Sequence, residues 1–123
     1  MHVRCDWPWS YSEGLLRASE RSYLVVIVEH DIVPTPGQVH DLVTCPHDFC
    51  ATDYELSNGQ RWAAVADHGC LGLSKITHRA WDRVTATPKV PNVDWRDLAG
   101  TLGQRLGYPH VHPGPADHRH VRL

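Results

Sequence analysis

Three of the four cysteines lie between Cys45 and Cys70, and this stretch constrains the fold more than any other. Four residues separate Cys45 from Cys50, and a single glycine separates His68 from Cys70. Two close pairs of sulfur and nitrogen donors, brought together by a fold in the chain, are the usual ligand set of a tetrahedral zinc site. The spacing predicts a structural Zn²⁺ bound by Cys45, Cys50, His68 and Cys70. His47 and His78 are the replacement candidates.

Two other interpretations of these cysteines stay open. Small, buried, reduced cysteines beside ordinary histidines would need no metal. In a secreted chain, four cysteines could instead pair as disulfides in three ways. However, residues 1–7 show no apolar signal-peptide core, and the longest apolar run, from Leu24 to Val28, is too short to span a membrane. We therefore expect a cytoplasmic protein whose cysteines are reduced or metal-bound, with Cys5 outside the site.

The length and charge of the chain limit its organisation and its partners. At 123 residues and 41% hydrophobic composition, the chain is expected to form one domain, which a metal would help to stabilise. A net charge of -2 argues against a general electrostatic grip on nucleic acid, although protonating the ten histidines near pH 6 would make the chain positive. A protein partner is therefore expected first, nucleic acid second, and a membrane not at all.

Local patterns predict an α+β fold, with a small β-hairpin or antiparallel sheet, a zinc knuckle and two to three packed helices. Residues 22–33 are rich in β-branched side chains and predict a central strand buried on both faces. Residues 34–37 break this strand, and residues 38–44 would return as its hairpin partner and lead into Cys45. The remaining predicted elements are a short strand at 53–56 and helices at 13–21, 61–67, 74–84 and 92–107.

One of these helices has an alternative, and the domain is expected to end before the C-terminal residues. The Asn58-Gly59 dipeptide favours a hairpin, which competes with the helix at 61–67. Residues 1–108 are expected to form the zinc-stapled domain. Residues 109–123, rich in His and Pro, are expected to be a flexible tail whose His-x-His pairs could bind a metal loosely.

A wider pattern extends across residues 45–91. The cysteine pair is followed by an alanine-rich segment ending in His68-Gly69-Cys70, then by Trp81-Asp82-Arg83 and Pro88-Lys89-Val90-Pro91. This order resembles a domain family of unknown function carried by actinobacteria and their phages, in which a cysteine pair precedes a His-x-His, a Trp-Arg segment and Pro-Val-Val-Pro. Here the cysteines stand further apart, and a cysteine replaces the second histidine. The resemblance implies a phage or mobile-element accessory protein with a metal site and no known activity.

Two function classes follow from these patterns. The first is a non-enzymatic binding module with no catalytic residues, in which zinc stabilises the fold and a helix or sheet edge meets a partner. If the partner is nucleic acid, the helix at 74–84 would contact it, since this segment resembles the recognition helix of winged-helix repressors. The alternative is an ordinary solvent-exposed helix face. The residues of this helix expected to be exposed are Lys75, Thr77, His78, Arg79 and Arg83.

The second class is a metal-dependent hydrolase or nuclease that uses the same Cys/His cluster. A catalytic zinc keeps one open coordination position and needs a nearby general base. The candidate bases are His47, Asp48, Asp67 and His78. No His-Glu-x-x-His or His-x-Glu signature accompanies them. The sequence therefore favours the binding module.

Overall fold

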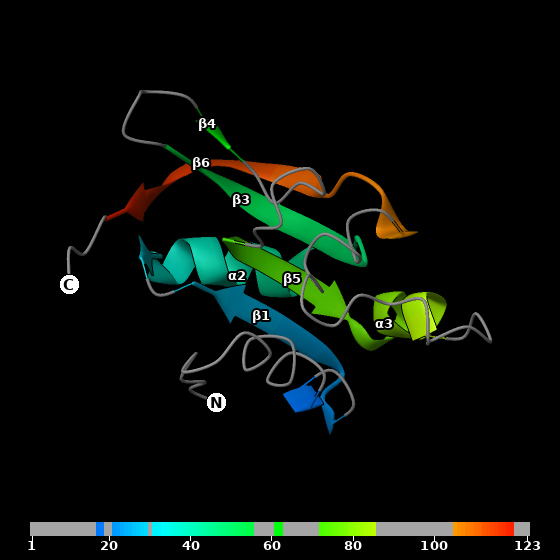
Figure 1. Ribbon diagram of the computed structural model, residues 1–123. Helices are drawn as coiled ribbons and strands as arrows, with labels where there is room; N and C mark the ends of the chain where they lie inside the picture. Colours follow the sequence, from blue (N-terminus) through cyan, green and yellow to red (C-terminus); the bar gives the residue numbers. More distant parts are fainter. Residues whose placement is uncertain are drawn as a thin grey trace, which may run out of the picture.

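The computed structural model describes residues 17–18, 21–29, 31–55, 61–62, 72–85 and 105–119. These residues form an α+β fold with a sheet and two helices (Figure 1). In chain order the elements are β1 (Leu24–Val28), β2 (Ile32–Val33), α2 (Pro36–Thr44), β3 (Phe49–Glu55), β4 (Arg61–Trp62), β5 (Leu73–Thr77), α3 (His78–Thr85) and β6 (His110–His118). Arg17, Ala18 and Arg21 are also helical, within the helix expected at 13–21.

The strands form a mixed sheet in the order β1-β5-β3-β6-β2, and β4 pairs with the end of β3. β3 and β6 run parallel, whereas the other pairs are antiparallel. Figure 1 shows α2 behind this sheet, where Leu42 is fully buried against Cys50 and Leu73. The α+β class is thus confirmed, but the sheet is mixed and not wholly antiparallel.

Strand β1 lies at an edge of the sheet, not at its centre. Within the described ranges it pairs only with β5, and its residues are half-buried, apart from the exposed Val28. The predicted strand at 22–33 is also divided, since β1 ends at Val28 and β2 begins at Ile32. Next to the end of β1, Glu29 Oε1 accepts a hydrogen bond from Gly72 N at 2.6 Å. A run of β-branched residues favours a strand but does not fix its place in the sheet.

The segment expected to be the second strand of a hairpin is helix α2. Thr35 Oγ1 accepts a hydrogen bond from Gln38 N at 3.1 Å, and Gln38 Oε1 accepts one from Thr35 N at 2.9 Å. This reciprocal capping box, with Pro36 in the first turn, satisfies main-chain donors at the start of the helix. The prediction was wrong because it rested on the break at residues 34–37 after a strand. Val39, Leu42 and Val43 have the i, i+3, i+4 spacing of a helix.

Residues 74–84, expected to be one helix, divide at Thr77. The first part is β5, which is hydrogen-bonded on one side to β1 and on the other to β3. Helix α3 begins at His78, where Thr77 Oγ1 accepts a hydrogen bond from Ala80 N at 3.2 Å. The strand is favoured over the helix expected from the periodicity, because pairing with β1 and β3 gives hydrogen-bond partners to its main-chain N–H and C=O groups on both sides.

The residues expected to form a flexible tail from 109 onward include β6, which lies between β3 and β2. A Cβ at Gly114 would overlap the main chain of Asp53, so glycine permits the close approach of the two strands. His118 anchors the far end, with Nδ1 3.0 Å from Glu55 O and Nε2 2.8 Å from Asp31 Oδ2. Close backbone contact and these anchors offset the scarcity of large apolar side chains in β6.

The other predicted elements are covered only in part. Arg61 and Trp62 form β4, antiparallel to Tyr54 and Glu55, which agrees with the hairpin interpretation; residues 63–67 lie outside the described residues. Of the helix expected at 92–107, the described residues 105 and 106 are helical, and 92–104 lie outside. Among the residues that the structure describes, no helix is long and apolar enough to cross a membrane.

Candidate metal centre

Three side chains that could bind one metal ion meet on the side of the sheet covered by α2. Ligand atoms of Cys45, Cys50 and His112 all lie within 4.8 Å of one another. Cys45 follows the last residue of α2, Cys50 is the second residue of β3, and His112 lies in β6. The cluster thus joins three elements that are separate in the sequence.

The register of the sheet explains why these side chains meet. Cys50 is the partner of His110 across β3 and β6, and Thr52 is the partner of His112. Because partners share a face and alternate residues return to it, Cys50, Thr52, His110 and His112 project on one side. Cys45 reaches the same side because α2 packs there and ends at this residue, whose N–H donates to Leu42 O.

The geometry and chemistry of the three donors fit a zinc ion. With bond lengths of about 2.3 Å to sulfur and about 2.0 Å to nitrogen, two ligands of one tetrahedral zinc lie roughly 3.5–3.8 Å apart. The ligand atoms here lie within 4.8 Å of one another, and small side-chain rotations would bring them into that range. His112 Nε2 is also buried and has no hydrogen-bond partner in the described part of the chain. A buried imidazole nitrogen without a partner, in a ring that lies near two thiols, favours metal binding.

The surroundings of these groups set their pKa values. Burial, followed by a hydrogen bond with Cys45, raises the pKa of Cys50 to about 12, so this thiol stays protonated. Its Sγ lies 3.9 Å from Leu42 O, which accepts its weak hydrogen bond. Burial and the neighbouring His110 lower the pKa of His112, which keeps the imidazole neutral. A metal would displace thiol protons but would meet an imidazole with a free lone pair.

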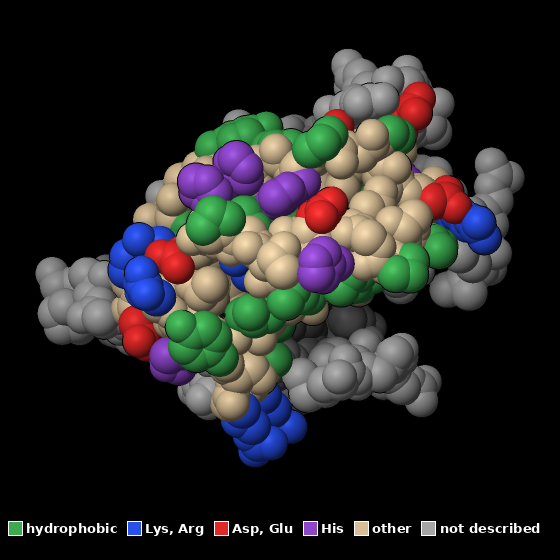
Figure 2. All heavy atoms as spheres, turned by 180° about the vertical axis from the view of Figure 1, so that it is seen from behind, with side chains coloured by type: hydrophobic (Ala, Val, Ile, Leu, Met, Phe, Trp, Pro, Cys, Tyr) green, Lys and Arg blue, Asp and Glu red, His purple; other side chains and the backbone are tan. Residues whose placement is uncertain are grey.

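Two further histidines surround the centre. The rings of His47 and His110 stack with centroids 4.0 Å apart, and His110 meets His112 edge-on at 5.1 Å. Figure 2, which views the molecule from behind, shows histidine side chains gathered on this face. His47, a replacement ligand in the sequence prediction, is therefore near the centre but packs on His110 and does not belong to the group of three donors.

A lysine lies beneath the loop that carries the first cysteine. Lys75 is only 1% exposed, and it is the cross-strand partner of Cys50. Its Nζ donates hydrogen bonds to Cys45 O at 2.8 Å and His47 O at 2.6 Å. On the same face, the buried Thr52 Oγ1 has no hydrogen-bond partner within the described residues. The centre is thus lined by a cation and an unused hydroxyl as well as by the three donors.

The structure brings together two of the four predicted zinc ligands. Cys45 and Cys50 carry free thiols and lie side by side, whereas His68 and Cys70 lie outside the described residues. His112 was missed because its segment was expected to be a tail. The available signal was the His110-Val111-His112 alternation, which in a strand places both histidines on one face.

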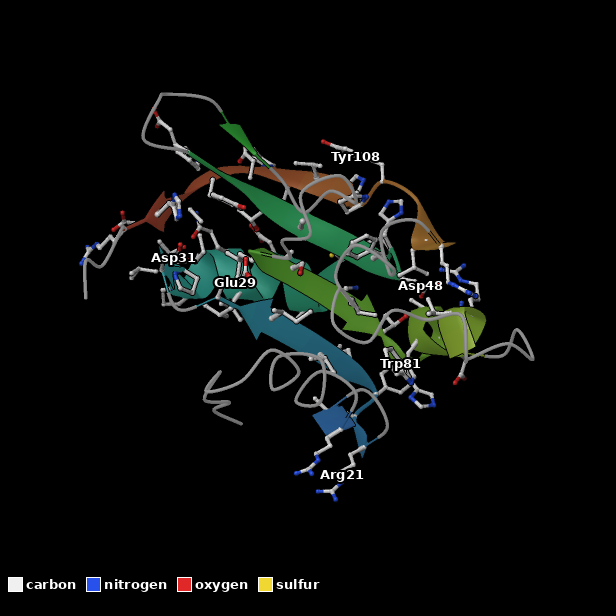
Figure 3. The ribbon with its side chains drawn as sticks, viewed as in Figure 1. Arg21, Glu29, Asp31, Asp48, Trp81 and Tyr108 are labelled. Atoms are coloured by element: carbon white, nitrogen blue, oxygen red, sulfur yellow. The ribbon has the colours of Figure 1, made fainter. Side chains whose placement is uncertain are left out.

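The five residues expected to form an exposed partner-binding helix do not lie on one helix. Lys75 is buried in β5, and Thr77 Oγ1 donates to Asp48 Oδ1 at 2.9 Å. Asp48, labelled beside α3 in Figure 3, also lies 3.4 Å from Arg83 Nη2. The other two residues, His78 and Arg79, lie in α3 with Arg83. Of the surface predicted to bind a partner, only the three residues in α3 remain on one helix.

Comparisons with protein families, with curated proteins and with solved structures find no match to this chain.

Proposed function

We propose that this chain is a small zinc-binding accessory protein whose metal, bound by Cys45, Cys50 and His112, fixes the fold of a binding module. The metal would connect the end of α2, the start of β3 and the middle of β6. Thiolates and imidazole are the donors that structural zinc sites use, which supports Zn²⁺ over Mg²⁺ or Ca²⁺. The presented surface would meet a protein partner first and nucleic acid second, since the net charge is -2.

The observation that carries the proposal is the orphaned nitrogen of His112. A buried imidazole nitrogen without a partner costs stability, and native structures seldom tolerate one. Nε2 of His112 is in this state within the described residues, and a nitrogen of the same ring lies within 4.8 Å of the two thiol sulfurs. A bound metal would satisfy the nitrogen and would also replace the weak thiol hydrogen bond of Cys50.

A second function is favoured by one observation. Only three donors meet within the described residues, and three protein ligands are the number found at catalytic zinc, where water occupies the fourth position. This supports a metal-dependent hydrolase as the alternative. Against it, Cys45 and Cys50 are buried, and the candidate base Asp48 is already engaged by Thr77 and Arg83.

The test is the zinc content of the full chain, purified without chelator, for the wild type and two variants. The wild type should carry about one zinc per chain. His112→Ala should lose most of it, whereas His110→Ala should keep it, because His110 lies on the same face of the same strand but outside the donor group. Equal zinc content in both variants would contradict the assignment of His112.

Hydrolytic activity of the zinc-loaded wild type distinguishes the hydrolase from the binding module. Hydrolysis of simple phosphodiesters and esters that disappears in Asp48→Asn, with zinc content unchanged, would favour the hydrolase. The binding module predicts no such activity. Asp82→Asn, which changes an exposed carboxylate of α3, is the matched control.

A further inference from the structure

We propose that His47 and His110 form a second, weaker metal site, open to solvent, through which Zn²⁺ reaches the buried donors. The entry role rests on the proposed zinc site, whereas the weak site can be tested separately from it. Three features support the pair: the exposure of both rings, their unused nitrogens, and the contact of His110 with His112.

The three donor residues of the proposed zinc site differ in their access to solvent. Cys50 is 0% exposed and Cys45 is 8% exposed, whereas His112 is half-buried. A hydrated ion from solution therefore has its most open approach on the side of His112. A buried metal site needs such an entry path in addition to its ligands.

Two exposed histidines lie on that side. The ring of His110 meets the ring of His112 edge-on, with centroids 5.1 Å apart, and the ring of His47 stacks on His110 at 4.0 Å. The side chains of His47 and His110 are both exposed, and Figure 2 shows histidine side chains together on this surface. The three rings thus form a row that leads from the surface to the donor group.

The nitrogens of the two outer rings are available to a metal. Within the described part of the chain, the side chains of His47 and His110 make no hydrogen bond. Neutral imidazole is the commonest metal ligand in proteins. The two ring planes lie 13° apart, so both rings must turn about their Cβ–Cγ bonds to reach one ion, and their exposure leaves room for this.

Two imidazoles would bind an ion less tightly than the buried donors do. The remaining coordination positions would be filled by water, which exchanges readily. The buried centre instead offers two sulfurs and one nitrogen, a donor set typical of structural zinc. The difference in affinity favours transfer of the ion from the exposed pair to the buried centre.

Both histidines are carried by segments that the sheet holds in place. His110 is the partner of Cys50 across β3 and β6. The main-chain oxygen of His47 accepts a hydrogen bond from Nζ of the buried Lys75 at 2.6 Å. The two rings are therefore kept next to each other although their residues are distant in the sequence.

A carboxylate near the row favours the approach of a cation. Asp41, an exposed residue of α2, acts on His112 electrostatically, and its effect is larger than the opposing effect of Lys75. A negative charge on the outer side of a metal site raises the local concentration of cations. The charge around the row thus agrees with entry of Zn²⁺ from this side.

The first experiment counts ions by titrating the metal-free full chain with Zn²⁺ beyond one equivalent. The wild type should bind one ion tightly and a second weakly. His47→Ala and His110→Ala should keep the tight ion and lose the weak one, whereas His112→Ala should lose the tight ion and keep the weak one. His40→Ala, which removes an exposed histidine of α2 without ring contacts in the described residues, should keep both.

The second experiment measures the entry role by rapid mixing. Uptake of Zn²⁺ by the metal-free chain is followed first, and then release of the tight ion to an excess of chelator. An entry site speeds both directions, so its loss should slow both equally and leave the Kd of the tight ion unchanged. We expect His47→Ala and His110→Ala each to slow both rates roughly tenfold, which corresponds to about 1.4 kcal/mol. His40→Ala should change neither rate.

The outcomes separate the exposed pair from the buried centre. Without a tight ion in the wild type, the proposed function fails and the entry role fails with it, whereas the weak ion is still counted. A wild type without a weak ion, or a weak ion that persists in His47→Ala and His110→Ala, overturns the second site. If both variants are folded by circular dichroism and take up zinc at the wild-type rate, the entry role is wrong and the buried centre stands. If the Kd of the tight ion rises while its release is not slowed, the two rings support the buried centre and are not an entry route.

Discussion

Cys50 and His112 bring ligand atoms within 4.8 Å of each other although they lie far apart in the sequence. The parallel pairing of β3 with β6 produces this contact, because Cys50 stands opposite His110 and His112 is two residues further along. A metal bound here would therefore hold β6 against β3 in addition to any main-chain hydrogen bonds. Its removal should loosen β6 first.

Removing the metal should lower the stability of the whole domain. A ligand bound only to the folded state stabilises it by about 4 kcal/mol when its free concentration is a thousand times Kd. For a domain of this size, that corresponds to a fall in Tm on the order of 10 °C. Calorimetry before and after chelation, followed by addition of zinc, measures the effect. An unchanged Tm in protein shown to have lost its metal would be inconsistent with a structural role.

The metal-free protein should lose stability at alkaline pH through Cys50. Burial raises the pKa of this thiol from 9.0 to about 12. Because the folded state holds the proton more tightly than the unfolded state, this contribution is complete below about pH 9 and is lost as the pH rises towards 12. The Tm of chelated wild type should therefore fall more steeply above pH 9 than that of Cys50→Ala. Parallel curves for the two proteins would contradict the shift.

His118 should hold β6 in the sheet whether or not metal is bound. Both of its ring nitrogens bond to oxygens of other elements, and its side chain is only 6% exposed. His118→Ala should cost roughly 2 kcal/mol, because it removes the contacts of the ring nitrogens with the Asp31 carboxylate and the Glu55 carbonyl. Figure 3 shows Asp31 at the end of the sheet away from Asp48, so Asp48 and its partners should be unaffected.

Arg119→Ala is the matched control for this prediction. Arg119 is adjacent in sequence, and its exposed side chain pairs with Asp117 at 2.8 Å. Exposed pairs of this kind contribute between about 0 and 1 kcal/mol. Chemical denaturation of both variants gives the two values. Equal losses would mean that the His118 contacts do not anchor β6.

The cap of α2 should be measurable in the same way. Thr35→Ala removes the hydroxyl that accepts from Gln38 N and should destabilise the protein by about 1 kcal/mol. Thr44→Ala, at the other end of the helix, removes only an exposed hydroxyl that donates to His40 O. We expect it to change the free energy of unfolding by less than half as much. A Thr35 variant as stable as the wild type would contradict the capping box.

The sequence predicted the α+β class, the first strand and the cysteine pair, because these depend on local composition and close spacing. It did not predict α2, although the Thr35–Gln38 capping box and the i, i+3, i+4 spacing of Val39, Leu42 and Val43 are both typical of a helix. Nor could it predict Lys75 in the interior, because a lysine is ordinarily exposed and the carbonyl oxygens of Cys45 and His47 that accept its hydrogen bonds come from a distant part of the chain.

His112, the third donor, could not be predicted because its place in the centre depends on a contact between distant segments that no local sequence pattern specifies. His112 reaches Cys50 only because β6 pairs parallel to β3, and parallel partners can be separated by long stretches of chain. The Pro- and Gly-containing segment around it favours a loop when read locally. Its strand conformation depends on the glycine at 114 and on the anchoring of His118, both of which are tertiary contacts.

The most direct test of the zinc centre is X-ray absorption at the zinc edge of the protein as purified. We expect at least two sulfur ligands at about 2.3 Å and an imidazole nitrogen at about 2.0 Å. The nitrogen signal should be lost or weakened in His112→Ala and retained in His110→Ala. A spectrum without sulfur ligands, or an imidazole signal that does not change in His112→Ala, would contradict the assignment of Cys45, Cys50 and His112.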